Sequence, residues 1–325
     1  MTYNFITVGG ATRDISFFTD AGVLIKNKKD ILRQELLAFE YGAKIKVDEF
    51  YYTFGGGAAN TAVNLANFGL KTACLTSIGD DENGKMILKN LKDRKVKVDL
   101  VKTKRGAQSG FSFILVTDKG ERVIFANRGA NKFLDITKKD LELLSKTKNI
   151  YIASLSGKWE ANLRKLFSVK DANIFWNPNE AQYSSGLNKL AKFLKKTKVL
   201  FLNKDEAIEL VLSASNYKKA SNRFLNDSKN LLRILKSYGP EIVVITAGKN
   251  GVDAYDGTVF YHRDITKEKK RVDATGIGDA FNSTFSAGLE VYKGNIDKAL
   301  TLALRNAASK IAHLGAQNGL IKFKK

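Results

Sequence analysis

The feature that most constrains the fold is a repeated alternation of short apolar runs with longer segments of helical periodicity. Runs rich in β-branched and aromatic residues predict strands at 4–10, 71–79, 149–155, 172–177, 198–203 and 241–248. Apolar residues at helical spacing predict helices at 58–68, 84–92, 138–145, 159–167, 187–194, 204–212, 229–237, 278–292 and 296–313. Several strands are apolar without interruption, as burial on both faces requires. The alternation therefore predicts an α/β fold with a mostly parallel central sheet.

Two regions, about 13–54 and 107–128, depart from this rhythm. They contain runs of alternating polarity, such as GFSFILV and ERVIFAN, which a turn at 117–121 would join. Alternation indicates strands with one exposed face, so these regions predict a small antiparallel sheet standing off the main one. Because no flexible linker or internal repeat interrupts the chain, we expect residues 1–325 to form one domain with this β appendage.

Charge is the most unusual global property, with 54 basic and 33 acidic residues and a net charge of +21. Such a field favours anionic partners, including nucleic acids. The basic residues are nevertheless scattered, and the chain carries no helix-turn-helix or zinc-finger spacing, so we expect no specific nucleic-acid partner. No run is long enough to span a bilayer and no signal peptide is recognisable, so we expect no membrane partner. The single cysteine, Cys74, sits in an apolar run and suits a reducing cytoplasm.

The segment VDATGIGDAFNSTFSAGL, residues 272–289, is the strongest candidate for chemistry. Gly276 and Gly278 lack Cβ atoms, so successive backbone N–H groups can converge on one point, and the following helix directs its positive dipole end there. This is a site for phosphate charge. Asp279, in the first turn, suits a general base that accepts a hydroxyl proton. Taken alone, the pattern is equally typical of a capped helix after a glycine loop.

A second glycine cluster, Gly55–Gly57, precedes another helix and is followed by Asn60, whose amide can bind sugar-like hydroxyls. Tight packing of a helix on a sheet is the competing interpretation. Asp14 follows the first strand, at the edge where open α/β sheets bind ligands, and its carboxylate could hold two hydroxyls of a polyol.

Two further motifs follow predicted strands. Asn203 and Glu206 begin a helix and share a face, so they could orient a hydrated magnesium ion or simply cap the helix. Thr246 and Gly248 end a buried strand in a turn suited to close passage of a nucleotide. The chain lacks the GxGxxG fingerprint after its first strand that a nicotinamide-dependent dehydrogenase needs, and it contains no GxxxxGK[ST] phosphate loop.

In combination these motifs resemble the ribokinase-like (PfkB) superfamily of sugar and nucleoside kinases. The similarity runs in order from Gly9 to Asp14, through GGGAANTA and SIGDDENG, to NKDE, TAG, DATGIGD and the closing RNAASKIAHLGAQ. It implies a three-layer α/β/α core and identifies the small sheet as a lid that closes over the sugar and often mediates dimerisation. Ile277 departs from the family's usual alanine at that position.

The resemblance also implies roles for individual residues. It implies acceptor contacts for Asp14, Gly55, Gly56 and Asn60, and placement of magnesium and phosphates by Asn203 and Glu206. It implies that Thr246 and Gly248 line the ATP groove and that Asn306 lies beside the nucleobase. It implies an anion hole from Gly276, Ile277, Gly278 and Asp279, with Asp279 as the base. A monovalent cation, potassium, would bind near Asp273, Thr275 and the segment 315–316.

The expected function is therefore phosphoryl transfer from magnesium-ATP to a hydroxymethyl group of a sugar, in a cytoplasmic enzyme that dimerises through its lid. A nucleoside kinase of the adenosine kinase kind is the closest alternative, because the acceptor hydroxyls are similar. A basic nucleic-acid-binding protein on an inactive kinase fold is a more distant one. It predicts salt-sensitive nucleic-acid binding without ATP turnover.

Overall fold

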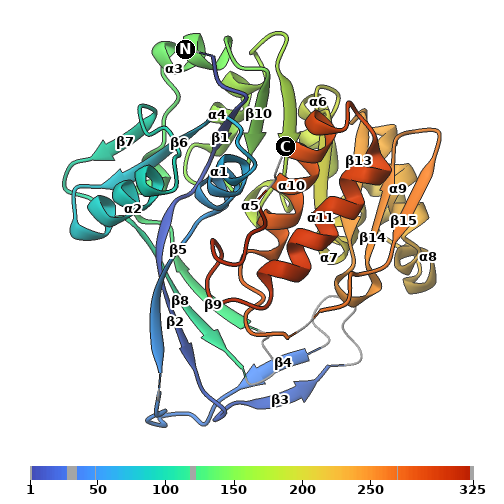
Figure 1. Cartoon of the computed structure of the whole chain (residues 1–325). Helices are drawn as coiled ribbons and strands as arrows, with labels where there is room; N and C mark the ends of the chain where they lie inside the picture. Colours follow the sequence, from blue (N-terminus) through green and yellow to red (C-terminus); the bar gives the residue numbers. More distant parts are fainter. Residues whose placement is uncertain (1, 28–34, 48, 118–121, 269, 323–325) are drawn as a thin grey trace.

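A nine-stranded sheet runs through the centre of the computed structural model, which describes residues 2–27, 35–47, 49–117, 122–268 and 270–322 (Figure 1). Its strand order is β15-β14-β13-β12-β11-β10-β1-β6-β7. The strands are β1 (Phe5–Val8), β6 (Thr72–Gly79), β7 (Val101–Lys104), β10 (Asn149–Ile152), β11 (Asn173–Trp176), β12 (Val199–Asn203), β13 (Ile242–Thr246), β14 (Val252–Tyr255) and β15 (Phe260–Arg263). All neighbours pair in parallel except β13–β14 and β14–β15, which confirms the predicted mostly parallel sheet.

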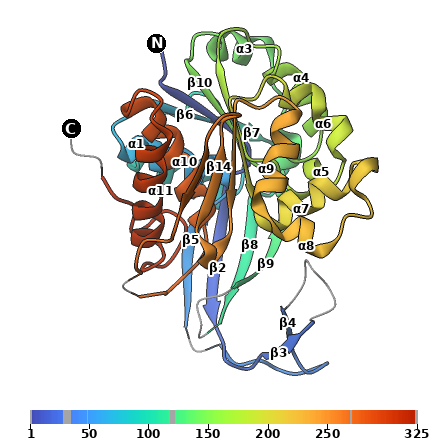
Figure 2. The same ribbon diagram turned by 90° about the vertical axis from the view of Figure 1, so that its right-hand side faces the viewer.

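Helices cover both faces of this sheet, as Figure 2 shows. One layer contains α1 (Gly57–Asn67), α2 (Glu82–Asp93), α10 (Ile277–Val291) and α11 (Ile296–Lys310). The other contains α3 (Lys138–Leu144), α4 (Trp159–Leu166), α5 (Glu180–Tyr183), α6 (Leu187–Leu194), α7 (Lys204–Leu212), α8 (Asn222–Asn226) and α9 (Ser228–Ser237). Short 3₁₀ turns lie at Gly129–Phe133, Ser215–Tyr217 and Gly248–Asn250. Each layer buries its own apolar core against the sheet, so the expected three-layer architecture is confirmed.

The predicted lid is a second sheet of four strands in the order β5-β2-β8-β9. Its strands are β2 (Thr12–Phe18), β5 (Phe50–Gly55), β8 (Gly110–Val116) and β9 (Arg122–Asn127), and a hairpin of β3 (Val23–Lys26) and β4 (Glu35–Ala38) stands beside it. The β2–β5 and β8–β9 pairs are antiparallel as predicted. The central β2–β8 pair is parallel, because both strands leave the main sheet in the same direction (Figure 1). Most of the predicted turn at 117–121 lies outside the described residues.

Register gives the lid sheet two distinct faces. Thr53, Asp14, Ser112 and Ala126 lie opposite one another across the four strands, and so do Tyr52, Ile15, Phe113 and Phe125. Because successive side chains of a strand point to opposite faces, the polar row and the apolar row lie on opposite sides of the sheet. The polar row faces the carboxyl ends of the main sheet's parallel strands, because Ser112 and Ala126 line a cavity together with residues at the ends of β12 and β13.

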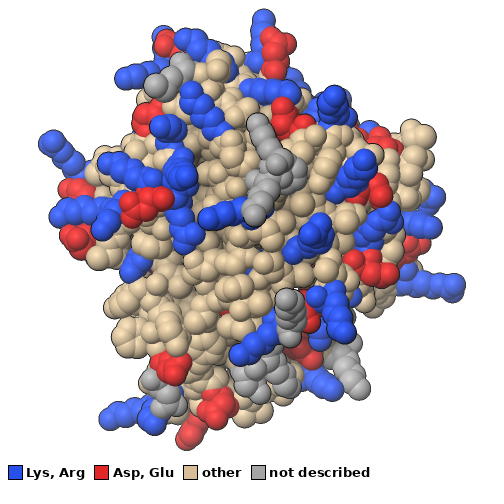
Figure 3. All heavy atoms as spheres, viewed as in Figure 1, with Lys and Arg blue, Asp and Glu red and all other residues tan. Residues whose placement is uncertain are grey.

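The charged side chains do not gather into a stripe on the face that Figure 3 shows. Lys and Arg are mixed there with Asp and Glu, and the area over the lid strands is largely free of charge. Among the described residues, none of the helices combines the length and apolar character needed to cross a bilayer. Cys74 is fully buried, as its apolar surroundings predicted.

Candidate active site

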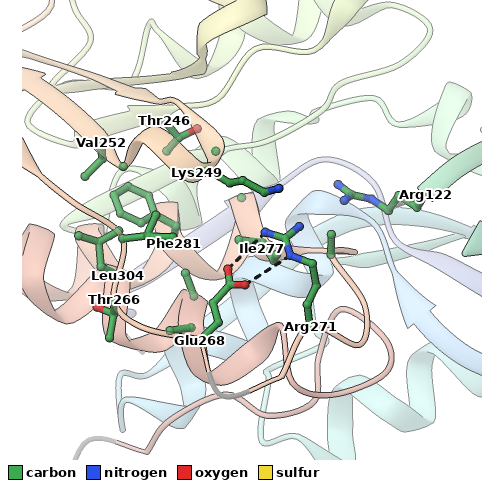
Figure 4. Close-up of a pocket in the computed structure, with 17 residues that line it drawn as sticks. Arg122, Thr246, Lys249, Val252, Thr266, Glu268, Arg271, Ile277, Phe281 and Leu304 are labelled. Carbon is green, nitrogen blue, oxygen red and sulfur yellow. Dashed lines mark hydrogen bonds and ion pairs between the residues drawn. The ribbon is translucent and has the colours of Figure 1, made fainter. Parts of the chain in front are cut away.

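Two adjoining hollows lie where the parallel strands end. The polar cavity, about 450 Å³, is lined by Thr12, Gly56, Gly57, Asn60, Ser112, Arg122, Ile124, Ala126, Arg128, Asn177, Leu202, Asn203, Glu206, Thr246, Thr275, Gly276, Gly278, Asp279 and Asn282. The apolar groove, about 280 Å³, is lined by Arg122, Thr246, Gly248, Lys249, Gly251, Val252, Ile265, Thr266, Glu268, Arg271, Ala274, Ile277, Gly278, Phe281, Leu304, Ala307 and Ala308 (Figure 4). Arg122, Thr246 and Gly278 line both, so the start of α10 stands at their junction.

The two glycines of the loop before α10 are required for different reasons. Gly276 has φ +74°, and a Cβ there would lie 2.4 Å from the Cβ of Ala316, so conformation and packing both exclude a side chain. A Cβ on Gly278 would meet nothing within 4 Å, because this residue opens onto the hollows. The first-turn amides of a helix have no intrahelical acceptor, so Gly278 and Asp279 present N–H groups and a positive helix end to a ligand.

The sequence predicted that the Ile277 N–H would belong to this set of free amides, but the structure shows that it does not. Its N–H donates to the carbonyl of Ala274 at 3.3 Å, closing a turn in the loop. Its side chain instead lines the apolar groove, as do Phe281 and Leu304 (Figure 4). A branched residue therefore replaces a small one here as part of the groove wall.

Asp279 lines the polar cavity, and its carboxylate is oriented by Asn60, whose Nδ2 donates to Oδ2 at 2.8 Å. Burial raises the pKa of Asp279 to about 6, and the Asn60 hydrogen bond and the positive charge of Arg122 oppose that rise. The carboxylate is thus a stronger base than an ordinary aspartate and remains ionised at neutral pH.

Asn60 has a second partner that the sequence did not indicate. Gln317 Nε2 donates to Asn60 Oδ1 at 3.1 Å, so both ends of the Asn60 amide are engaged. Because its donor group points at Asp279, Asn60 orients the carboxylate rather than lying free for an acceptor, although it does line the polar cavity. The Gln317 contact spans residues far apart in the chain, and no local sequence pattern signals it.

Asp14 and the glycine cluster at 55–57 form one packed unit. A Cβ on Gly55 would lie 1.9 Å from Asp14 Oδ2, so this glycine makes room for the carboxylate and does not itself line either hollow. Gly56 has φ +88°, and a Cβ added to it would lie 2.5 Å from the Gly10 carbonyl oxygen. Burial raises the pKa of Asp14 to about 6, opposed by hydrogen bonds from Thr12 and Ser112. Its buried Oδ1 has no hydrogen-bond partner among the described residues.

Asn203 and Glu206 form a capping box at the start of α7. Asn203 Oδ1 accepts from the Glu206 N–H at 2.8 Å, and Glu206 Oε2 accepts from the Asn203 N–H at 2.8 Å. Both residues also line the polar cavity. Burial raises the pKa of Glu206 to about 7, and the Asn203 hydrogen bond opposes the rise. The two side chains therefore cap the helix, as one interpretation of the sequence predicted. They also line the polar cavity, where their oxygens could face a ligand.

The apolar groove has the character of a nucleotide site. Phe281, Val252 and Leu304 supply its walls, and Lys249 extends toward it (Figure 4). At its rim Arg271 Nη2 donates to Glu268 Oε1 at 3.3 Å. Thr246 and Gly248 line the groove as predicted from the turn after β13.

Asn306 does not line this groove, in contrast to the place beside the nucleobase that the family resemblance implied. It is fully buried, and its Nδ2 donates to Asn64 Oδ1 at 2.9 Å and to Thr284 Oγ1 at 2.6 Å. Its Oδ1 accepts from the Ile321 N–H at 2.8 Å. Its side chain therefore joins α1, α10, α11 and the segment after α11, and Ala307 and Ala308 line the groove in its place.

The predicted potassium site at Asp273 and Thr275 also differs from expectation. Asp273 is fully buried, and its carboxylate accepts from the N–H groups of Thr275 at 2.7 Å and Gly315 at 2.8 Å. The position beside it is taken by the ammonium of Lys310, which donates to the Asp273 carbonyl at 2.7 Å. Although burial favours the protonated acid, the Lys310 charge and these hydrogen bonds lower the pKa of Asp273. The residues present therefore do not fit a monovalent cation.

Two arginines at the ends of the lid strand β9, Arg122 and Arg128, also belong to the site, which the sequence alone did not establish. Residues 122, 124 and 126 of β9 line the polar cavity, as the period of a strand requires, and Arg128, directly after the strand, lines it too. The Arg122 charge opposes the rise in the pKa of Asp279, so this guanidinium acts on the base from across the cavity. The alternation of RVIFANR could have indicated a shared face, but not which face met the site.

Comparison with known proteins agrees with this geometry. The pfkB family carbohydrate kinase profile matches residues 28–322. The chain is 29% identical over 264 residues to an uncharacterized sugar kinase of Archaeoglobus fulgidus, covering 79% of this chain and 98% of that protein. It is 27% identical over 281 residues to ribokinase of Mus musculus, covering 85% of this chain and 84% of that protein.

Solved structures share the fold at low identity. Ribokinase of Arabidopsis thaliana, complexed with ribose and ATP, superposes with a TM-score of 0.76 at 19% identity, covering 98% of this chain and 96% of that one. Adenosine kinase of Sinorhizobium meliloti superposes with a TM-score of 0.79 at 19% identity, covering 98% and 97%. The ribokinase-like fold and the family match lead to one conclusion: the chain belongs to the pfkB family of carbohydrate kinases, ATP-dependent phosphotransferases that act on hydroxyl groups.

Proposed function

We propose that this kinase transfers the γ-phosphoryl group of ATP to a hydroxymethyl group of a free sugar, with Asp279 as the general base. The supporting observation is the position of Gly278 and Asp279 at the junction of the apolar groove and the polar cavity. We further propose that residues 1–325 act as one catalytic unit in the cytoplasm, for which the buried, unpaired Cys74 is suited.

Each hollow has a distinct part in the proposed reaction. The groove binds the adenine nucleotide against Phe281 and Ile277, and the polar cavity holds the sugar under the lid. Asp279 accepts the proton of the acceptor hydroxyl as that oxygen forms its bond to the γ-phosphorus. The bond from that phosphorus to the bridging oxygen of ATP breaks, and ADP departs with the electron pair. The Gly278 and Asp279 amides stabilise the charge on the transferred group.

Asn203 and Glu206 would hold magnesium through its water ligands. Amide and carboxylate oxygens suit this ion, which keeps several waters and binds largely through nucleotide phosphates. Among the described residues there is no group of three or more His, Cys, Asp or Glu side chains able to hold a metal. Bound magnesium would neutralise phosphate charge.

The lid side of the cavity offers polar groups suited to sugar hydroxyls, because Thr12 and Ser112 line it. Asp14, with its unpartnered Oδ1, does not line the cavity but lies opposite Ser112 on the same lid face. The test is a panel of ribose, fructose, adenosine and their monophosphates, with ATP consumption and product mass as readouts. We expect a free sugar to give the highest kcat/KM. Preference for adenosine would favour the nucleoside kinase alternative, and absence of turnover with salt-sensitive nucleic-acid binding would favour the binding protein.

The raised pKa of Asp279 predicts a pH dependence. As pH rises through about 6 this carboxyl loses its proton and can act as a base, so kcat/KM should rise with pH and level off above about 7. Below about pH 6 it should fall about tenfold for each pH unit. Rates measured from pH 5 to 9 check this, with circular dichroism at each pH as the control for folding. A profile flat down to pH 5 would contradict the assignment.

We also propose that two copies associate through the outer face of the lid. Tyr52, Phe113 and Phe125 lie in one row across the sheet and are 59%, 44% and 58% exposed. Arg13 lies over the Tyr52 ring at 5.1 Å, at the edge of this row. An exposed aromatic face of this kind is typical of a protein–protein interface, and a second copy of the lid would bury it.

Phe125→Asp should therefore convert a dimer to a monomer. A carboxylate buried in an apolar interface is left unpaired, which we expect to weaken association by about 10²-fold or more. Size-exclusion chromatography with light scattering measures the change. Met86→Asp, at a residue 41% exposed on α2, is the matched control and should leave the dimer intact. A monomeric wild-type protein at high concentration would contradict this proposal.

A further inference from the structure

Lys310, in the last turn of α11, carries an ammonium group that is fully buried between two segments of backbone. Its Nζ donates to the carbonyl oxygen of Asp273 at 2.7 Å and to that of His313 at 3.3 Å. It also lies 4.0 Å from Asp273 Oδ2, and neither side chain is exposed to solvent. Three oxygens from two separate segments thus surround one cationic group, and one of them is ionised.

These two segments support the loop at 273–276 before α10, the phosphate-binding loop of the proposed function. Asp273 accepts a hydrogen bond from the Gly315 N–H at 2.8 Å, which joins the start of the loop to the segment after α11. Gly276 packs so closely on Ala316 that a Cβ there would lie 2.4 Å from the Ala316 Cβ. The amide of Gly278 lies two residues after Gly276 in the chain. Lys310 therefore joins the two segments whose contact sets the position of the Gly278 amide.

Stability alone does not explain a lysine at this position. Removing a cation and a carboxylate from water is costly, and replacing a buried ion pair with apolar residues of similar volume is often neutral or stabilising. Burial lowers the pKa of Lys310 to about 8, opposed by Asp273, which reflects this cost. Backbone carbonyls and a carboxylate are ligands typical of a metal cation, and here the chain supplies the positive charge itself.

We propose that the Lys310 ammonium is a built-in cation of this kinase, which holds the phosphate-binding loop in place and makes phosphoryl transfer independent of potassium. The inference rests on the proposed function, because it concerns the loop that precedes Asp279. Lys310 is a positioning residue, since its ammonium acts on the reacting groups only through Asp273, His313 and the loop. It occupies the position at which the sequence predicted a potassium ion.

The first test is the cation dependence of the wild-type enzyme. Rates in KCl, NH₄Cl, NaCl and choline chloride, at equal ionic strength and saturating substrates, should agree within about twofold. Activation of about tenfold or more by potassium over choline would overturn the proposal. This measurement needs no variant and therefore does not depend on how well a variant folds.

The second test removes the ammonium. Lys310→Ala leaves a small space beside Asp273, and a loop displaced by about 1 Å can cost about 10²-fold in kcat. In choline chloride we expect a loss of that order, and KCl or NH₄Cl should restore about tenfold or more of it. Lys298→Ala, at an exposed residue in the first turn of the same helix, is the matched control and should keep wild-type rates in every salt. A Lys310→Ala enzyme with wild-type turnover would overturn the proposal.

Thermal unfolding supplies a readout separate from activity. Potassium should raise the Tm of Lys310→Ala above its value in choline chloride, because the ion binds the folded site, whereas the wild-type Tm should be equal in the two salts. A potassium-specific rise in the wild-type Tm would overturn the inference. If the wild type phosphorylated no acceptor, the proposed function would fail, and the unfolding series would still decide what occupies this position.

Discussion

Asp279→Asn should lower kcat by at least about 10²-fold, the lower end of what a general base contributes to a reaction. The substitution preserves shape, and the new side-chain oxygen can still accept the hydrogen bond that Asn60 Nδ2 makes to Oδ2 at 2.8 Å. What it removes is the ability to take the acceptor proton. Because the apolar groove is unchanged, the Kd for ATP should remain close to that of the wild type, as calorimetry can measure.

Stability provides a further check on the same variant. Burial raises the pKa of Asp279 to about 6, so the ionised form is disfavoured in the folded protein relative to the unfolded chain. At pH 8, where the wild-type carboxylate is charged, a neutral Asn should therefore raise the Tm. A rise in Tm together with a loss of turnover distinguishes a lost base from a damaged fold. Asp93→Asn, at an exposed residue at the end of α2, is the matched control and should change neither. Turnover within a few-fold of wild type in Asp279→Asn would refute the assignment of the base.

Six strands of the main sheet, β1, β6, β10, β11, β12 and β13, were predictable because they are largely buried on both faces and therefore read as continuous apolar runs. The partly exposed edge strand β7 and the antiparallel edge were not predicted. In β14 and β15, Asp253 and His262 lie opposite one another, and His262 Nδ1 lies 2.8 Å from Asp253 Oδ1. A cross-strand polar pair takes the place of apolar residues there, so these segments resemble loops in the sequence. Edge strands with an exposed face tolerate such pairs.

The site was predictable where its chemistry lies in local sequence and unpredictable where it depends on distant contacts. The DATGIGD loop and the capping box of Asn203 and Glu206 are local, and the structure brings both to the same cavity. Asn306 and Lys310 lie on one helix, whose periodicity does not say which polar residue faces the interior. Lys310 is one of 54 basic residues, nearly all of which suit an exposed surface. Only packing against Asp273 and His313 distinguishes it.

Gly278→Val should abolish most phosphoryl transfer while leaving the fold intact, and the structure explains why the neighbouring glycine is not equivalent. A side chain at Gly278 meets no protein atom within 4 Å and therefore projects into the space shared by the groove and the cavity. Valine is no worse than glycine within a helix, so the Tm should not fall. Its methyl groups would exclude phosphate oxygens from the first-turn amides, which we expect to lower kcat/KM for ATP by about 10²-fold or more.

Gly276→Ala is the informative contrast, because φ +74° and the contact with Ala316 make it a stability variant that should lower the Tm. Gly278→Ala, with its single methyl group, should fall between the wild type and Gly278→Val in kcat/KM. If Gly278→Val phosphorylates the acceptor at the wild-type rate, then the loop only begins a helix and the phosphate binds elsewhere. If instead activity falls with side-chain volume at 278 while the Tm holds, then the open space in front of this glycine is where the transferred phosphate lies.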